Sequence, residues 1–226
     1  TSSNPAVATV DDKGVVEGKS EGRARVFLNI VVDGKESILQ ASCIINIKSE
    51  FVIENRELVA YKGLGGVVEI PDDEGIMYIG SFAFCHYNLD NEKEVDDKYD
   101  LDDKKEPLGN NSVTKVIIPK GVQEIRKFAF YNCEKLVEVV LGEDCKKIDE
   151  YAFYNDVKLE TINFENVKTV SDYAFAKCSL LDNVLFDNVN FIGKFAFAEC
   201  KSLSSANLAD MRRSGEGAFS DCPRLR

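Results

Sequence analysis

The pair Ala-Phe returns along this chain at a nearly constant interval, and this interval is the strongest constraint that the sequence places on the fold. The pair occurs six times, and successive copies from the second to the last are 23, 22, 22 and 22 residues apart. The copies are Ala83-Phe84, Ala129-Phe130, Ala152-Phe153, Ala174-Phe175, Ala196-Phe197 and Ala218-Phe219. A period of this length indicates a solenoid in which each repeat forms one coil.

Other positions keep the same step. An aliphatic residue stands five residues before most of the phenylalanines, and a leucine or valine opens each unit. The first set is Ile79, Ile125, Ile148, Val170 and Ile192, and the second is Val113, Leu136, Leu159, Leu181, Leu203 and Leu225. A cysteine follows the phenylalanine by three residues in most units, whereas Asp156 replaces it in one, and Ser214 makes the sixth unit degenerate.

A unit of this length has too little apolar surface to close a core of its own, so it must bury that surface against its neighbours. Residues at equivalent positions are then expected to form columns inside the solenoid. We expect the six-residue strand that opens each unit, such as 113–118, to pair in parallel with the next strand about 4.8 Å away. The prediction is a mainly β fold with one long parallel sheet along one face and the phenylalanines on the opposite wall.

The apolar residues from Val113 to Cys133 also follow a regular spacing. It has the form Leu-x-x-Val-x-Ile-Pro-x-x-Val-x-x-Ile-x-x-x-Ala-Phe-x-x-Cys, with Val113 in the leucine position. This pattern resembles the BspA-like (Treponema-type) leucine-rich repeats of bacterial surface proteins, over about residues 50–226. The resemblance implies a leucine-rich repeat solenoid that is exposed on the bacterial cell surface, extracellular, and used in adhesion to host matrix proteins. The sequence departs from the pattern at Asp156, in the sixth unit and in one insertion.

Residues 1–48 lack the period and alternate between apolar and polar residues. Two such runs flank Asp33-Gly34, a dipeptide typical of a tight hairpin, so this part is expected to be antiparallel β. The stretches 3–16 and 22–27 resemble the second half of a group-2 bacterial immunoglobulin-like domain. Because roughly half of such a sandwich is missing, we expect the chain to begin inside that domain, or its open edge to pair elsewhere, including self-association through the truncated ends.

The predicted division is therefore a partial immunoglobulin-like module over residues 1–48 and a solenoid over residues 49–226. The solenoid is expected to open with a hairpin, 49–66, and to carry an acidic insertion, 88–111, which supplies −5 of the formal net charge of −11. Such a segment buries little and is expected to project as a mobile loop. Its aspartates suit calcium, but their spacing fits no EF-hand loop and a solvated charge run is the alternative. No metal or cofactor is assigned.

The negative charge also limits the partners. A net charge of −11 repels nucleic acid and anionic lipid headgroups, so neither is an expected partner. No stretch of the sequence approaches the roughly 18 consecutive apolar residues of a membrane span, so membrane insertion is not expected. The single histidine, His86, stands beside Cys85, but adjacent side chains in an extended chain point apart, so no catalytic residue is assigned.

The repeat cysteines form no C-x-x-C pair that would hold zinc. Equivalent positions in stacked coils project their side chains in parallel, which is poor geometry for a disulfide. Buried free thiols that act as small apolar residues are therefore favoured over disulfides.

The candidate binding surface is the outward face of the opening strands. Ile117, Val140 and Leu185 are apolar where solvent favours polar side chains, which is a common mark of a contact site. The structural alternative is that parallel strands favour β-branched residues in any case. The assigned residues are Lys115, Ile117, Glu138, Val140, Thr161, Asn163, Asn183, Leu185, Ser205 and Asn207.

The expected function is that of a non-enzymatic cell-surface or secreted binding protein that adheres to a host protein or glycan through this face. One alternative is a polysaccharide-active enzyme of the parallel β-helix type, which would need clustered carboxylates on adjacent coils. The strands offer Glu138, Glu160 and Asp182 for that role. The other alternative is a purely structural spacer.

Overall fold

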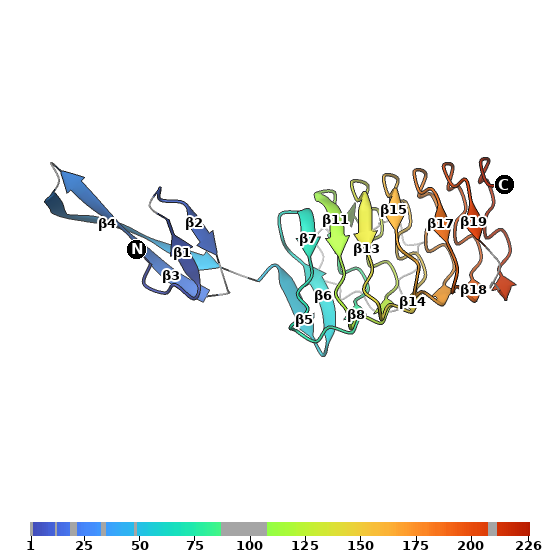
Figure 1. Cartoon of the computed structure of the whole chain (residues 1–226), viewed down its shortest axis with the longest axis horizontal. Coiled ribbons are helices and arrows are strands. Elements are labelled where there is room, and N and C mark those ends of the chain that lie inside the picture. The colour runs from blue at the N-terminus through green and yellow to red at the C-terminus, as the bar shows by residue number, and fades with distance from the viewer. Residues whose placement is uncertain are drawn as a thin grey trace. The chain divides into compact units, whose positions relative to one another are not determined.

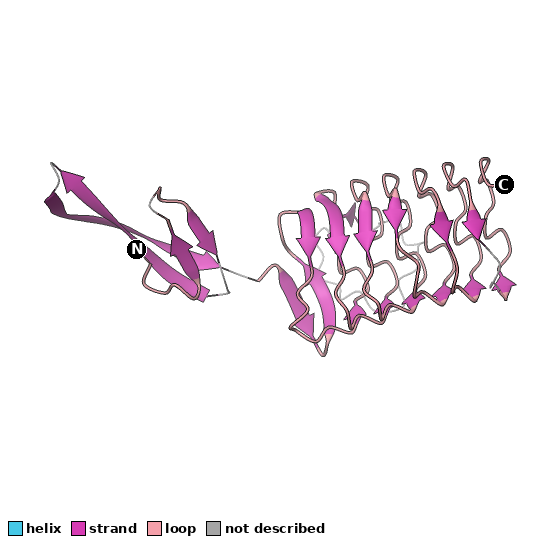
Figure 2. Ribbon diagram, viewed as in Figure 1, coloured by secondary structure: helices cyan, strands magenta, loops and turns pink. Residues whose placement is uncertain are grey.

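The repeats form stacked coils in the computed structural model. The structure describes residues 2–11, 13–18, 22–32, 35–47, 49–86, 108–207 and 212–226. The chain divides into two compact units, the N-terminal unit of residues 1–50 and the solenoid of residues 51–226. Every regular element in the described ranges is a strand, as Figure 2 shows, so the predicted mainly β class is confirmed.

The N-terminal unit consists of antiparallel pairs. Its strands are β1 (Ala8–Val10) with β2 (Val16–Gly18), and β3 (Gly22–Val32) with β4 (Lys35–Ile47). Among the side chains described in this unit, Val7, Ala8 and Ala24 form a small buried apolar cluster, and Val26 is buried as well. The predicted antiparallel strands around the hairpin are therefore present, while residues 33–34 lie outside the described residues. The assignment of this unit to an immunoglobulin-like domain stays a prediction.

One sheet of the solenoid, here called the long sheet, runs through all of its coils (Figure 1). Its strands follow in chain order from an antiparallel hairpin, β5 with β6, into parallel pairs. The strands are β5 (Phe51–Glu54), β6 (Glu57–Tyr61), β8 (Tyr78–Ile79), β12 (Glu124–Ile125), β14 (Lys147–Ile148), β16 (Thr169–Val170), β18 (Phe191–Ile192) and β20 (Arg213–Ser214). They contain the aliphatic residues that stand five positions before the phenylalanines.

The strands that open the units form a second set, here called the head sheet. Its first part is parallel and four-stranded, and its second part is a separate parallel pair. The strands are β7 (Gly66–Glu69), β11 (Val113–Ile117), β13 (Glu138–Val140), β15 (Thr161–Ile162), and then β17 (Val184–Leu185) with β19 (Ala206–Asn207). A short antiparallel pair, β9 (Cys85–His86) with β10 (Leu108–Gly109), flanks the acidic insertion.

The head strands correct the prediction of one unbroken sheet of six-residue strands. They pair in parallel as predicted, but they shorten from five residues in β11 to two in β15, and the ladder stops between β15 and β17. On the other side of β15, the Asn163 side chain extends the link to the coil of β13: it accepts from the Leu141 N–H at 2.7 Å and donates to its carbonyl at 3.1 Å. Asn183 has a φ of 44°, which is outside the extended region that a strand requires.

The predicted phenylalanine column is confirmed. The rings of Phe84, Phe130, Phe153, Phe175, Phe197 and Phe219 stack in that order, with successive centroids 4.5, 4.9, 5.0, 5.1 and 5.5 Å apart. All but the last are fully buried, and they belong to one cluster with the aliphatic columns. Burial of a phenylalanine side chain stabilises a protein by about 1.5–3 kcal/mol, so this shared column holds neighbouring coils together.

A second aromatic column lies two residues before the first and was not predicted from the sequence. Phe128, Tyr151, Tyr173 and Phe195 stack with successive centroids 5.1, 5.0 and 5.2 Å apart. Each adopts a positive φ of 52–60°, which is unusual for an aromatic residue and turns the chain tightly into the Ala-Phe pair. Gly217 occupies the position in the last coil, where a Cβ would lie 2.4 Å from the Phe195 ring.

Candidate binding face

The pairing register of the head sheet defines which side chains share its outward face. One outward row contains Val67, Lys115, Glu138 and Thr161, and the next contains Glu69, Ile117 and Val140. The residues between these rows, such as Val116 and Val139, point into the core and are buried. This alternation follows from the period of two along a strand, and it puts the predicted residues of the first coils side by side.

The predicted residues differ in how far they reach into solvent. Ile117, Val140 and Asn163 are half-buried, whereas Thr161, Asn183, Ser205 and Asn207 are exposed. Leu185 is 61% exposed and is separated from Val140 by the polar Asn163 in the coil between them. The three apolar residues therefore do not form one continuous apolar strip.

Two charged residues of the first coils form an ion pair on this face. The Lys115 Nζ atom lies 2.8 Å from a carboxylate oxygen of Glu138, its partner in the register of β11 and β13. Both side chains are about one-third exposed, so the pair contributes little to stability. Both charges are nevertheless paired within the fold.

The later coils differ because their outward face is hollowed into a cleft of about 400 Å³. The lining comes from three successive coils and includes two residues predicted for the binding surface, Thr161 and Asn183. The full lining is Glu160, Thr161, Ile162, Leu180, Asp182, Asn183, Ser202 and Arg224. Glu160 and Asp182, which the sequence offered as carboxylates on adjacent coils, are thus brought to one site.

The cleft arises from side-chain size at equivalent positions. Just before each unit's leucine, the chain has Lys135, Lys158, Leu180, Ser202 and Arg224 in succession. The small Ser202 of the fifth coil leaves a gap between the longer side chains of its neighbours. Leu180, Ser202 and Arg224 were not predicted as binding residues from the sequence. The change from lysine to leucine and serine at this repeat position could have indicated them.

Hydrogen bonds fix one carboxylate of the cleft. The Asp182 Oδ1 atom accepts from the backbone N–H groups of Asn183 at 2.8 Å and Ser204 at 3.2 Å, and from the Ser204 hydroxyl. The Ser204 and Ser205 hydroxyls also donate to the Asn183 side chain at 3.1 and 3.0 Å. The Ser204 hydroxyl bond, with the nearby Arg224 as a smaller cause, lowers the pKa of Asp182, so this group is ionised at neutral pH.

Other polar groups of the cleft keep their hydrogen-bonding capacity. Within the described part of the chain, Glu160 and Arg224 make no ion pair or side-chain hydrogen bond, and Asp182 Oδ2 has no hydrogen-bond partner. The same holds for the hydroxyl groups of Thr161 and Ser202. The cleft therefore combines two acceptors, one cationic donor and two hydroxyl groups that the fold itself does not satisfy.

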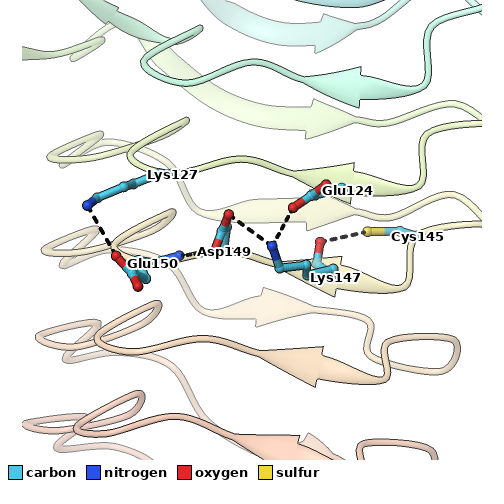
Figure 3. A network of polar contacts seen from close by, with 6 residues as sticks. All are labelled: Glu124, Lys127, Cys145, Lys147, Asp149 and Glu150. Atoms are coloured by element: carbon cyan, nitrogen blue, oxygen red, sulfur yellow. Dashed lines mark hydrogen bonds and ion pairs between the residues drawn. The ribbon is translucent and has the colours of Figure 1, made fainter. Parts of the chain in front are cut away.

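The outward face of the long sheet provides a contrast, because several of its charges are paired (Figure 3). Lys147 lies 2.6 Å from Glu124 and 3.1 Å from Asp149, and Lys127 lies 3.1 Å from Glu150. The contacts of Lys147 with Glu124 and of Lys127 with Glu150 join neighbouring coils. We therefore interpret this network as structural.

Several predictions concern residues whose placement is not described. Residues 87–107, most of the acidic insertion, lie outside the described residues, as does any calcium site there, and the side chain of His86 is not described either. Across the described ranges, no cluster of three or more His, Cys, Asp or Glu side chains could hold a metal ion. The same ranges contain no helix able to cross a membrane.

Comparison with known proteins supports the repeat assignment. Residues 106–226 match the model of the BspA type leucine rich repeat region in six copies. No curated protein matches the chain. Residues 51–105 precede the matched region, and there β6, β7 and β8 already pair with the coils that follow.

Two solved structures share the fold. The T. pallidum leucine-rich repeat protein is 23% identical with a TM-score of 0.57, over 75% of this chain and 82% of that one. A leucine-rich cell surface protein from Faecalibacterium prausnitzii is 24% identical with a TM-score of 0.54, over 78% of this chain and 51% of that one. At this identity the likeness extends to the fold alone.

Proposed function

The chain belongs to the family of BspA type leucine-rich repeat regions, and we propose on that basis that it is a non-enzymatic binding protein exposed on a bacterial surface. Its head-sheet face would bind a host protein or glycan and so serve in adhesion. The observation that carries this proposal is the cleft, where Glu160, Asp182 Oδ2 and Arg224 lack partners within the described residues. Charged groups left in this state are available to a ligand, whereas Lys115 and Glu138 are not.

A rigid scaffold supports the same proposal. The side chains of the cleft come from three coils that share the phenylalanine column, so their spacing is fixed before a ligand arrives. A preformed site avoids the entropic cost of ordering loops on binding. A surface location for this chain agrees with the description of the F. prausnitzii protein, which shares its fold, as a cell surface protein.

For the N-terminal unit we propose the second half of an immunoglobulin-like domain that spaces the solenoid from the cell envelope. Its support is the antiparallel pairing of β1 with β2 and of β3 with β4. The domain boundary at residue 48 and the entry hairpin of residues 49–66 belong to the same proposal.

A polysaccharide-cleaving enzyme is a second candidate, because the cleft brings together Glu160 and Asp182 from adjacent coils. Glycoside hydrolysis by two carboxylates needs one of them to be protonated as a general acid, which requires a raised pKa. The pKa of Asp182 is lowered instead, so Asp182 cannot supply that proton at neutral pH. Glu160 would have to be the acid, and Glu160→Gln would then abolish turnover.

Binding of the 226-residue chain to immobilised matrix proteins and to a glycan array tests the proposal. We expect saturable binding that Thr161→Arg abolishes, since the long side chain would fill the cleft. Thr169→Arg makes the same change in the long sheet and serves as the matched control, which should bind as the unchanged protein does. Depolymerisation of polysaccharides would favour the enzyme. The absence of both binding and turnover would favour a structural spacer. Either result would contradict the proposal.

A further inference from the structure

We propose that the cleft between Glu160, Asp182 and Arg224 binds a neutral saccharide of one or two sugar rings. This inference rests on the proposed binding function and names the ligand class of the same site. It follows from the size of the cleft, the kinds of hydrogen-bonding groups that line it, and their charges.

The size of the cleft favours a small ligand over a folded protein surface. Its volume of about 400 Å³ lies at the lower end of the range for small-molecule sites, which is about 300–1,000 Å³. A stable protein–protein interface buries about 800 Å² on each partner, which needs a much larger contact area. A terminal sugar of a glycan, or a disaccharide unit within it, matches a shallow cleft that is open to solvent on one side.

The lining groups require a ligand that both donates and accepts hydrogen bonds. Ionised Asp182 and the carboxylate of Glu160 can only accept, so the ligand must donate to them. Arg224 can only donate, so the same ligand must also accept. Each hydroxyl group of a sugar does both, and neighbouring hydroxyls on a ring can bridge a carboxylate and a guanidinium.

The charges of the lining argue against ionic ligands. A ligand amine that approached the two carboxylates would also approach the Arg224 guanidinium, which repels it. An anionic sugar would meet two carboxylates and a chain with a net charge of −11. A neutral polyhydroxyl compound meets neither obstacle.

The cleft also offers an apolar contact. Leu180 is 43% exposed and lines the cleft together with Ile162. Sugar rings have an apolar face of C–H groups, which packs against aliphatic side chains and gains stability by leaving water. The polar groups would orient the ring, and these two side chains would support one of its faces.

Titration of the ¹⁵N-labelled 226-residue chain with maltose, cellobiose and lactose, followed by amide chemical shifts, tests the inference. We expect at least one of these disaccharides to bind with a Kd of about 1 mM or tighter, with shifts centred on residues 160–162 and 180–183. N-acetylneuraminic acid and spermidine, which carry a negative and a positive charge, should bind more weakly than the best neutral disaccharide.

Two variants and two controls place the ligand in the cleft. Glu160→Gln and Arg224→Ala should each weaken binding about tenfold, as expected for the loss of a hydrogen bond to a charged group. Glu134→Gln and Lys135→Ala change exposed charges in an earlier coil, outside the cleft, and should leave the Kd unchanged. The amide spectrum of each variant establishes that it is folded.

Three results would overturn the inference: no binding of neutral disaccharides, equal binding by all four variants, or tighter binding of spermidine or N-acetylneuraminic acid. The chain could then still bind a matrix protein, and Thr161→Arg could abolish that binding. This result would keep the proposed binding function and exclude only the saccharide ligand. Loss of both kinds of binding would remove the proposed function as well.

Discussion

Asp156 occupies the position at which most other coils have a cysteine, and the environment of that column explains both residues. The buried thiols of Cys178 and Cys200 donate to the backbone carbonyls of Phe153 and Phe175, at 3.0 and 3.2 Å. Asp156 is fully buried, and its Oδ1 accepts from the Cys133 N–H at 2.7 Å, while Oδ2 has no partner. Burial raises the pKa of Asp156 well above 3.8, and the bond from Cys133 opposes this.

A raised pKa in the folded state makes stability depend on pH in a definite direction. Below about pH 3.8, Asp156 is protonated in both states and carries no penalty. As the pH rises toward its folded-state pKa, the unfolded state loses the proton first, and the free energy of unfolding falls by about 1.4 kcal/mol per pH unit. Asp156→Asn keeps the Oδ1 acceptor and cannot ionise, so we expect it to remove this slope.

Urea denaturation of both proteins between pH 4 and 8 measures the effect. The stability of Asp156→Asn relative to the unchanged chain should increase with pH and be largest at the alkaline end. Glu165→Gln removes an exposed carboxylate and should show no such trend. Parallel stability curves for the unchanged chain and Asp156→Asn would refute a raised pKa.

At the scale of elements, the strands are short and the columns between coils hold the solenoid together. Most strands of the long sheet have two residues, too few to be stable as an isolated ladder. The phenylalanine column adds ring contacts, and its backbone adds hydrogen bonds: the N–H groups of Phe130 and Phe153 donate to Ala152 and Ala174 of the next coil, both at 2.8 Å. Loss of a phenylalanine inside the column should therefore destabilise the solenoid more than loss of the phenylalanine at its end.

Replacement of one phenylalanine at two places in the column tests this view. Phe153 is fully buried between Phe130 and Phe175, so Phe153→Ala should lower the free energy of unfolding by about 3–5 kcal/mol. Phe219 is partly buried and stacks on Phe197 at the end of the column, so Phe219→Ala should cost about half as much. Equal losses in urea denaturation would mean that the column does not act through stacking on both sides.

At the scale of the whole molecule, the two units differ in length, with the N-terminal unit at residues 1–50 and the solenoid at residues 51–226. Among the side chains that the structure describes, the buried apolar residues of the N-terminal unit are Val7, Ala8, Ala24 and Val26, whereas the core of the solenoid runs through all of its coils. A shorter unit buries a smaller fraction of its surface, so the N-terminal unit should unfold at a lower urea concentration than the solenoid.

The sequence supplies separate probes for the two transitions. All eight tyrosines lie between residues 61 and 173 and the chain has no tryptophan, so tyrosine fluorescence reports on the solenoid alone. Far-ultraviolet circular dichroism reports on the strands of both units. We expect the dichroism signal to begin changing at a lower urea concentration than the fluorescence, and coincident curves would mean that the units unfold together.

The sequence by itself determined the period, the parallel coils and the buried columns. A single unit cannot bury its apolar residues alone, so spacing such as that of Phe130, Phe153 and Phe175 has one compact solution, which is stacking. The outward direction of Lys115 and Glu138 also followed, because side chains alternate along a strand.

The tertiary structure decided what depends on comparing neighbouring coils in space. Whether Ser202 leaves a gap depends on how far Leu180 and Arg224 extend beside it, and whether a charge stays unpaired depends on which side chain the register brings opposite. The interruption of the head sheet also depends on local conformation, because it coincides with Asn183, whose φ of 44° lies outside the extended region that a strand requires. The spacing in the sequence determines which residues are equivalent. The stacking of the coils determines which side chains lie beside one another, and so whether they leave a gap or form a pair.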